Sequence, residues 1–171
     1  LTKNIETMND FLAQTDAKVL FGLIPSAADI WRDRLPDGAP TADENHWIQE
    51  ICGRVEAPAV DLRAALACRS DEEIYYRTDH HWTSLGAFYG ANAILKSLGM
   101  EELELDQYTP RAVSDSFRGT NHSSAGAWWT EPDTITAYIP EEGKTVISNF
   151  TGRKEPGRLY VPEQLEVKNK Y

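Results

Sequence analysis

The chain has 171 residues, of which 41% are hydrophobic and 26% are charged, a composition typical of a single globular domain and not of a disordered or fibrous chain. Its net charge of −10 argues against nucleic-acid binding, because a polyanion would be repelled at long range, whereas an uncharged sugar would not. No apolar run approaches the length of a membrane span.

The first 68 residues alternate between helical and strand-like patterns. We expect helices over residues 3–15, 42–55 and 63–68, and short strands over residues 19–24 and 59–62. The run 19–24 is nearly continuous in apolar residues, as in a strand buried on both faces. Residues 33–40 hold two prolines and a glycine and predict a loop. Strands that alternate with helices favour a parallel sheet covered by helices.

The two cysteines, Cys52 and Cys68, lack the spacing of a CxxC or CxxH metal site. We interpret them as two buried thiols, with a disulfide between them as the alternative, which would fit an oxidising compartment. The chain begins at Leu1 and enters a helical pattern at once, without a methionine or a signal peptide. We therefore expect it to be a processed or trimmed part of a longer protein.

A strand-like lead over residues 74–76 is followed by a polar run and a long helix. Thr83 is expected to cap this helix, which continues to about Leu98, with Gly99 as its stop. Its buried stripe is expected to consist of the apolar residues at helical spacing, which are Leu85, Phe88, Ala91, Leu95 and Leu98. The polar run therefore lies directly before a helix.

After Gly99 the periodicity of apolar residues becomes less regular. Residues 104–130 are mixed and contain a cluster of Gly, Ser and Asn, whereas residues 133–139 alternate as a strand and residues 146–147 predict a weaker one. From residue 151 to Tyr171 the chain is charged and has little core content. We expect no closing element there.

The most informative segment runs from Tyr75 to Trp82 and places Asp79 two residues before His81. Three interpretations fit it. Asp79 could orient His81 as the general base of a catalytic dyad. Asp79 and one or both of His80 and His81 could bind a metal ion, although adjacent histidines rarely ligate one ion together. Asp79 could instead satisfy backbone amides while Trp82 packs beneath the following helix. The residues alone favour this structural interpretation over the dyad, and the dyad over the metal site.

The signature of the DHHW family of bacterial proteins is similar to residues 78–87, which read TDHHWTSLGA. That family resembles the SGNH-hydrolase-like domains of the alginate O-acetyltransferases, whose own motif reads Asp-x-His-Trp before a helix. Residues 23–27, 117–120 and 132–135 resemble further blocks of the family. The resemblance implies an α/β fold in three layers, with a mostly parallel sheet flanked by helices in a permuted SGNH-hydrolase-like arrangement. It implies one such domain over residues 1–171.

By this resemblance Asp79 and His81 form the catalytic dyad, and His80 is a neighbour. In such relatives the nucleophile is a serine in a Gly-Asp-Ser-like turn on the C-terminal side of the dyad, and no Gly-Asp-Ser occurs in this chain. The nearest match is Ser116, but no convincing buried strand precedes it, as a nucleophile elbow requires. We therefore expect the nucleophile beyond Tyr171, and an incomplete domain with little or no activity of its own.

The resemblance implies an O-acetyltransferase or acetylesterase that acts on an extracellular or cell-envelope polysaccharide, with an acetyl donor or an acetylated sugar as partner and with no metal or organic cofactor. It places the protein outside the cytoplasm and leaves membrane anchoring of the parent protein open. The alternative is a non-catalytic carbohydrate-binding or scaffold domain that keeps the Asp-His-His-Trp motif for its structure. Candidate substrate contacts are Tyr76, His80, Trp128 and Trp129. For the two tryptophans, packing beneath a loop is the favoured alternative.

Overall fold

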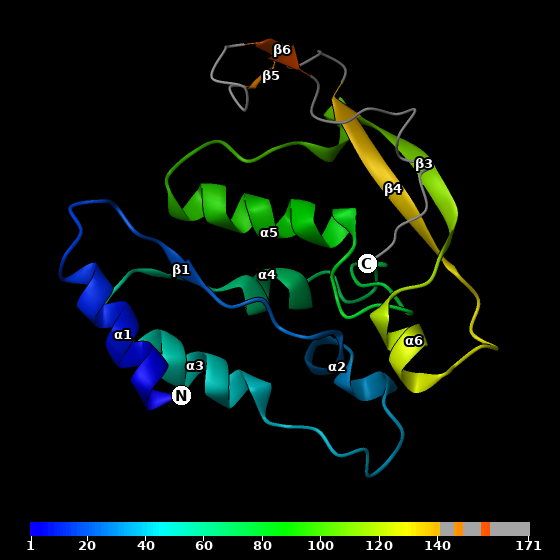
Figure 1. The fold of residues 1–171 in the computed structure, drawn as a ribbon, viewed down its shortest axis with the longest axis horizontal. Coiled ribbons are helices and arrows are strands. Elements are labelled where there is room, and N and C mark those ends of the chain that lie inside the picture. Colours follow the sequence, from blue (N-terminus) through cyan, green and yellow to red (C-terminus); the bar gives the residue numbers. More distant parts are fainter. Residues whose placement is uncertain (141–145, 149–154, 158–171) are drawn as a thin grey trace. The chain divides into compact units, whose positions relative to one another are not determined.

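The computed structural model describes residues 1–140, 146–148 and 155–157 (Figure 1). The chain divides into two compact units. Unit 1 comprises residues 1–76 and 80–102. Unit 2 comprises residues 77–79 together with the chain from residue 103 onward. None of the helices in the described residues is long and apolar enough to cross a membrane.

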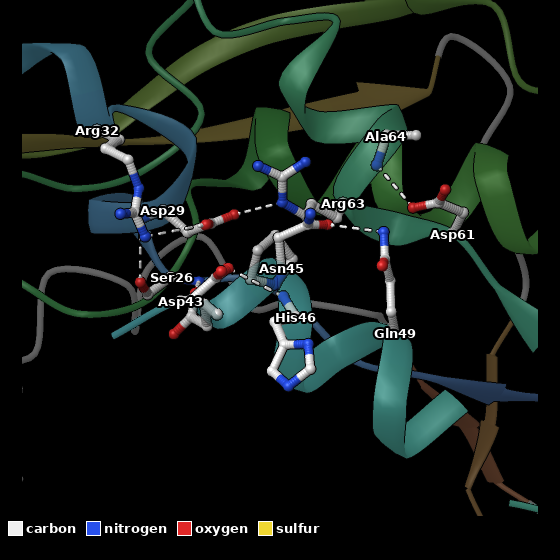
Figure 2. A network of polar contacts seen from close by, with 12 residues as sticks. Ser26, Asp29, Arg32, Asp43, Asn45, His46, Gln49, Asp61, Arg63 and Ala64 are labelled. Atoms are coloured by element: carbon white, nitrogen blue, oxygen red, sulfur yellow. Dashed lines mark hydrogen bonds and ion pairs between the residues drawn. The ribbon is translucent and has the colours of Figure 1, made fainter. Parts of the chain in front are cut away.

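Unit 1 consists of helices joined by loops, with one short sheet. Its elements in chain order are α1 (Thr2–Leu12), β1 (Phe21–Gly22), α2 (Ala27–Ile30), η1 (Arg32–Arg34), α3 (Glu44–Arg54), β2 (Ala59–Val60), α4 (Leu62–Ala67) and α5 (Ser84–Ser97). Four of these helices begin after a side chain that accepts a hydrogen bond from a backbone N–H three positions on, and these caps are Ser26, Asp43, Asp61 and Thr83. Figure 2 shows the caps at Asp43 and Asp61.

The three helices expected in the first 68 residues are present as α1, α3 and α4, each with slightly different ends. Both cysteines are free thiols, of which Cys52 is half-buried and Cys68 is exposed. The interpretation of two buried thiols is therefore wrong, because Cys68 lies at the exposed end of α4. Burial, and then the charge of Asp61, raise the pKa of the Cys52 thiol.

The parallel sheet of unit 1 is smaller than the sequence predicts. Strand β1 pairs with β2 in the register Phe21↔Ala59 and Gly22↔Val60. Gly22 is exposed and Ile24 is 52% exposed, so the expectation of a strand buried on both faces is wrong within the described part of the chain. The reason is that β2 is the sole hydrogen-bonded neighbour of β1 among the described strands, and a two-stranded sheet leaves much of its surface open.

The core of unit 1 includes the first residue of the motif segment. Its buried members are Ile30, Leu66, Ile74 and Tyr75, with Trp31, Trp82 and Leu85 among the half-buried side chains packed against them. The buried Tyr75 hydroxyl donates a hydrogen bond to the carbonyl of Pro25 at 2.5 Å. Burial, followed by the charges of Glu44 and Asp29, raises the pKa of Tyr75, so this donor stays protonated.

A buried ion pair ties α2 to α4 (Figure 2). Oδ2 of Asp29 accepts a hydrogen bond from Nε of Arg63 at 2.6 Å, and Oδ1 lies 3.9 Å from Nη2 of Arg32. The side chain of Asp29 is almost fully buried, whereas both arginines are partly exposed. Removal of the arginine partner would leave a buried charge uncompensated, which is the costly way to break such a pair.

Helix α5 confirms the cap at Thr83 and the stop at Gly99, which has a φ of +68°. The residues through which α5 packs most closely are not those of the predicted apolar stripe. The buried residues of α5 are Gly86 and Gly90, while Leu98 is 54% exposed. A Cβ built on Gly90 would lie 2.6 Å from the ring of Trp82. The predicted stripe is therefore wrong at Leu98, because α5 makes its closest contact through glycines, which carry no hydrophobic signal.

Substitution of Gly86 by alanine is expected to destabilise unit 1 by about 1–3 kcal/mol, because the new methyl would meet the carbonyl oxygen of Ile74 at 2.3 Å. Urea unfolding followed by tryptophan fluorescence measures this loss. The matched control is Gly53→Ala in α3, where a Cβ has nothing within 4 Å, and this change should stabilise by about 0.5–1 kcal/mol. Equal effects at both positions would contradict the close approach.

Unit 2 is built on a long antiparallel pair of strands. Its elements are η2 (Leu105–Gln107), β3 (Tyr108–Phe117), α6 (Thr120–Ala125), β4 (Asp133–Pro140), β5 (Val146–Ser148) and β6 (Glu155–Gly157). Strand β3 pairs with β4 from Tyr108↔Pro140 to Phe117↔Asp133, with two register shifts between Ala112 and Phe117. Strands β5 and β6 form a second, short antiparallel pair.

Strand β4 confirms the strand expected over residues 133–139, and β5 confirms the weaker one expected at residues 146–147. Residues 104–130, for which the mixed pattern predicts no particular element, contain η2, β3 and α6. Strand β6 lies within the stretch from residue 151 to Tyr171, and the expectation that this stretch ends without a closing element falls on residues 158–171, which lie outside the described residues.

Candidate active site

The segment around the motif is a short loop closed by backbone hydrogen bonds within unit 1. Tyr75 and Trp82 form an isolated antiparallel bridge, and the N–H of Tyr76 donates to the carbonyl of His81 at 3.2 Å. The N–H of Thr83 donates to the carbonyl of Ile74 at 2.9 Å. The ring of Trp82 lies against the glycine face of α5, as the structural interpretation of the motif predicts.

Asp79 is held by residues of unit 2 that lie about 40 positions further along the chain. Its Oδ2 accepts a hydrogen bond from the backbone N–H of Thr120 at 2.8 Å and one from the Thr120 hydroxyl at 3.1 Å. Asp79 is only 5% exposed. A Cβ on Gly119 would lie between 2.2 and 2.6 Å from Asp79 side-chain atoms. The carboxylate is therefore fixed in position by a donor pair and by the absence of a side chain at residue 119.

The residue before Asp79 belongs to a polar cluster in unit 2, which we define as Arg77, Thr78, Gly119 and Asp133, and all of these except Arg77 are buried. The carboxylate of Asp133 accepts hydrogen bonds from the N–H and Nε of Arg77, at 3.1 and 3.4 Å, and from the N–H and hydroxyl of Thr78, at 2.8 and 2.6 Å. The Thr78 hydroxyl also accepts from the N–H of Gly119 at 3.1 Å. The cluster thus links β4 to the beginning of α6.

Burial would by itself raise the pKa of the Asp133 carboxyl, but the hydrogen bonds from Thr78 and Arg77 outweigh burial. The pKa of Asp133 therefore lies below its ordinary value of 3.8, and the group is ionised at neutral pH. An ionised carboxylate is an acceptor only, which matches the four donors that surround it.

Both histidines of the motif are exposed, with ring centroids 3.9 Å apart and planes inclined by 37°. One potential ligand atom from each of Asp79, His80 and His81 lies within 4.8 Å of the others. Because these residues are consecutive, their proximity comes from the local path of the chain. Such a group could hold a metal ion only with further ligands, since protein zinc sites usually have four. An exposed imidazole two residues from a fixed carboxylate is also what general-base catalysis needs.

Ser116 lies within β3, where it is exposed, and its N–H lies 3.4 Å from the hydroxyl of Ser114. A nucleophile elbow places its serine on a sharp turn between a strand and a helix, whereas Ser116 precedes the last residue of an antiparallel strand. Ser116 makes no side-chain hydrogen bond with Asp79 within the described residues. The structure therefore shows no contact between Ser116 and the carboxylate that is predicted to orient the base.

Trp128 and Trp129 follow α6 and are 77% and 68% exposed. Their rings meet edge to face, with centroids 5.7 Å apart. The favoured expectation that they pack beneath a loop is wrong, because each presents most of its surface to solvent. Tyr76, the remaining candidate for substrate contact, is half-buried within the motif loop.

Four residues that position the motif have no role in the sequence interpretation, and they are Thr78, Gly119, Thr120 and Asp133. A signal for the last three exists, since residues 117–120 and 132–135 are two of the blocks that resemble the DHHW family outside the motif. Those blocks supply the donors to Asp79 and the acceptor for Thr78. Their proximity to residues 78–79 could not be inferred from the sequence alone.

Comparison with known proteins gives consistent matches. The family model for the SGNH hydrolase-like domain of the acetyltransferase AlgX matches residues 2–144. The probable alginate O-acetylase AlgJ of Pseudomonas syringae pv. tomato is 23% identical over 116 residues, which cover 64% of this chain and 30% of AlgJ. A DHHW family protein from Eubacterium siraeum is 30% identical in its crystal structure, with a TM-score of 0.72, and the match covers 85% of this chain and 49% of that protein.

Two further solved structures are similar in fold. The O-acetyltransferase domain of Pseudomonas putida AlgJ is 18% identical with a TM-score of 0.60, and the match covers 81% of this chain and 55% of that domain. Bacillus cereus PatB1, solved with a sulfonyl adduct, is 19% identical with a TM-score of 0.64, and the match covers 91% of this chain and 55% of that protein. The chain spans about half the length of these solved relatives and less than a third of AlgJ from P. syringae.

Proposed function

Since the chain belongs to the family of SGNH hydrolase-like domains represented by the acetyltransferase AlgX, we propose that it carries the base and its orienting carboxylate in a bacterial O-acetyltransferase or acetylesterase. The resemblance to DHHW proteins and alginate O-acetyltransferases is confirmed, and the SGNH-hydrolase-like α/β fold with it. The proposed substrate is a polysaccharide of the cell envelope, which would place the protein outside the cytoplasm.

One observation carries this proposal. The carboxylate of Asp79 is buried and fixed by both donors of Thr120, and the imidazole of His81, two residues on, is exposed. A general base must be open to its substrate, and its orienting partner must be held still. We assign these roles to His81 and Asp79.

The proposed reaction has two balanced steps. His81 takes the proton of a serine hydroxyl while the serine oxygen bonds to the carbonyl carbon of an acetyl donor, and the donor's leaving oxygen departs with the proton from His81. In the second step His81 takes a proton from a sugar hydroxyl or from water, whose oxygen bonds to the acetyl carbon, and returns that proton to the serine oxygen as it is released. A sugar acceptor gives transfer, and water gives hydrolysis.

We propose that the serine lies outside these 171 residues, and that strands there complete a three-layer, mostly parallel sheet beside β1. The support is that the chain spans only part of its relatives, that β1 leaves Gly22 and Ile24 exposed, and that Ser116 lies within a strand. Ser116 is the alternative nucleophile. No metal or organic cofactor has a role in this proposal.

The proposed carbohydrate partner would contact exposed rings. Pyranose CH groups stack on aromatic faces, and Trp128 and Trp129 present most of their surface. Tyr76 and His80 are further candidates within the motif loop. The exposed tryptophan pair also favours the second candidate function, a carbohydrate-binding domain that keeps the motif for its structure.

Replacement of His81 by alanine in the longer protein that contains this chain is expected to lower kcat/KM for an acetyl ester by about 10²–10⁴-fold, the usual contribution of a general base. Hydrolysis of p-nitrophenyl acetate measures it. His46→Ala is the matched control and should change the rate by less than about threefold, because His46 is an exposed histidine of α3 outside the motif.

The same assay decides the remaining alternatives. A loss of activity in Ser116→Ala as large as that in His81→Ala would assign the nucleophile to Ser116. Equal rates for the wild type and His81→Ala would rule out the catalytic function, and the carbohydrate-binding function would remain.

A further inference from the structure

We propose that Asp133 is a positioning residue that holds Asp79 in place through Thr78 and the backbone of Gly119 and Thr120. The contribution of this chain of contacts to catalysis rests on the proposed function of Asp79. The contacts themselves lie entirely within unit 2 and can be tested without an activity assay.

The first step is the orientation of one hydroxyl. Thr78 is 1% exposed, and its hydroxyl has a single proton to donate. The proton goes to Oδ2 of Asp133 at 2.6 Å, because an ionised carboxylate is a much stronger acceptor than the carbonyl of Phe117 at 3.4 Å. The oxygen lone pairs of Thr78 then face the N–H of Gly119, which donates at 3.1 Å.

The second step is the positioning of Thr120 by its peptide bond to Gly119. The bond from Gly119 fixes the backbone at the beginning of α6, and the next residue, Thr120, donates both its N–H and its hydroxyl to Asp79. A second bond, from the N–H of His122 to the carbonyl of Thr78 at 3.0 Å, ties the following turn to the same residue. The donors to Asp79 are thus placed by Thr78, and Thr78 is placed by Asp133.

The third step explains why a carboxylate is needed at residue 133. Its two oxygens accept from four donors on Arg77 and Thr78. An asparagine has one carbonyl oxygen and one NH₂ group, so either orientation would point N–H donors at other donors. The Asp133→Asn variant would therefore lose the bonds to one of the two residues and release the orientation of the Thr78 hydroxyl.

The test uses Thr78→Val, which removes the hydroxyl at nearly constant shape, with Thr78→Ser as the conservative rescue and Asp133→Asn as the second break. Hydrogen exchange of the Thr120 amide, followed by NMR on the folded 171-residue chain, should be about tenfold faster in Thr78→Val and Asp133→Asn and unchanged in Thr78→Ser. The matched control is Asp29→Asn, another buried, hydrogen-bonded aspartate, which lies in unit 1 and should leave the Thr120 amide unchanged.

Wild-type exchange at Thr120 in both Thr78→Val and Asp133→Asn would overturn the proposal. Faster exchange in Asp29→Asn as well would also overturn it, because general destabilisation would then explain the effect. If Thr120 responds as expected but acetyl-ester hydrolysis by the longer protein is equal in Thr78→Val and Thr78→Ser, the positioning of Asp79 stands and the proposed catalytic function fails.

Discussion

Substitution of Gly119 by alanine is expected to displace the Asp79 side chain and to destabilise unit 2 by about 2–4 kcal/mol. The backbone does not cause this effect, because Gly119 has a φ of −87° and a ψ of −165°, which any residue can adopt. The cause is space. The new methyl would lie 2.2 Å from Oδ2, 2.3 Å from Cβ and 2.6 Å from Cγ of Asp79. Either Asp79 or the beginning of α6 must move, and the bonds from Thr120 are lost.

Urea unfolding of the 171-residue chain measures this loss, and Ser124→Ala is the control, an exposed change on the same helix that should stay within about 0.5 kcal/mol of wild type. A double-mutant cycle identifies the clash. In an Asp79→Gly background the side-chain atoms that the methyl meets are absent, so Gly119→Ala should cost much less there. Equal costs in both backgrounds would show that the methyl meets something other than Asp79.

The steric requirement at Gly119 is a feature of the site that could not be predicted from the sequence. Asp79 and His81 could be identified because they are close in sequence and belong to a recognisable motif. Thr120 and Asp133 lie 41 and 54 positions beyond Asp79, and their contacts with residues 78–79 depend on the tertiary structure of unit 2. A single sequence shows which residue types are present in the later blocks, but not which loop they meet.

Local signals succeeded where the structure is determined locally. Thr83 accepts a hydrogen bond from a residue three positions on and Gly99 takes a positive φ, so both ends of α5 were predictable. Strand β3 was not predictable from the sequence, because its structure depends on a distant segment. It contains Pro110 and Arg111 and is mostly exposed, and its pairing partner β4 begins 16 residues after β3 ends, at Asp133. Its strand geometry comes from that partner and not from an apolar alternation.

The largest electrostatic effect is expected at Asp133, whose replacement by asparagine should destabilise the chain by about 2–4 kcal/mol near pH 7. The side chain is nearly buried and accepts four hydrogen bonds, two of them from Thr78, which is also buried. The ion pair with Arg77 adds little, because the Arg77 side chain is 60% exposed and solvent screens it. Most of the loss therefore comes from the donors of whichever residue, Arg77 or Thr78, faces the NH₂ group of the asparagine.

The pH dependence of this loss follows from the lowered pKa of Asp133. In the unfolded chain the carboxyl titrates near its ordinary value of 3.8, and in the folded chain it titrates below that value. The stabilisation is therefore fully present above the unfolded pKa, and it is lost as the pH falls through the folded pKa. The free-energy difference between wild type and Asp133→Asn should stay constant from pH 7 to about pH 5 and shrink toward about pH 2.5.

Urea unfolding of both proteins across this pH range measures the difference, with Asp115→Asn as the control, since Asp115 is exposed on β3 and should differ from wild type by less than about 0.5 kcal/mol. If the free-energy difference between wild type and Asp133→Asn did not change with pH, the loss would come from the shape of the amide. The stabilisation that an ionised carboxylate gives the wild type must disappear when that carboxylate is protonated. Acid and the Asp133→Asn substitution act on the same carboxylate. A wild-type chain at low pH should therefore also show the weaker protection of the Thr120 amide expected of that variant, relative to the intrinsic exchange rate at that pH and before its global unfolding.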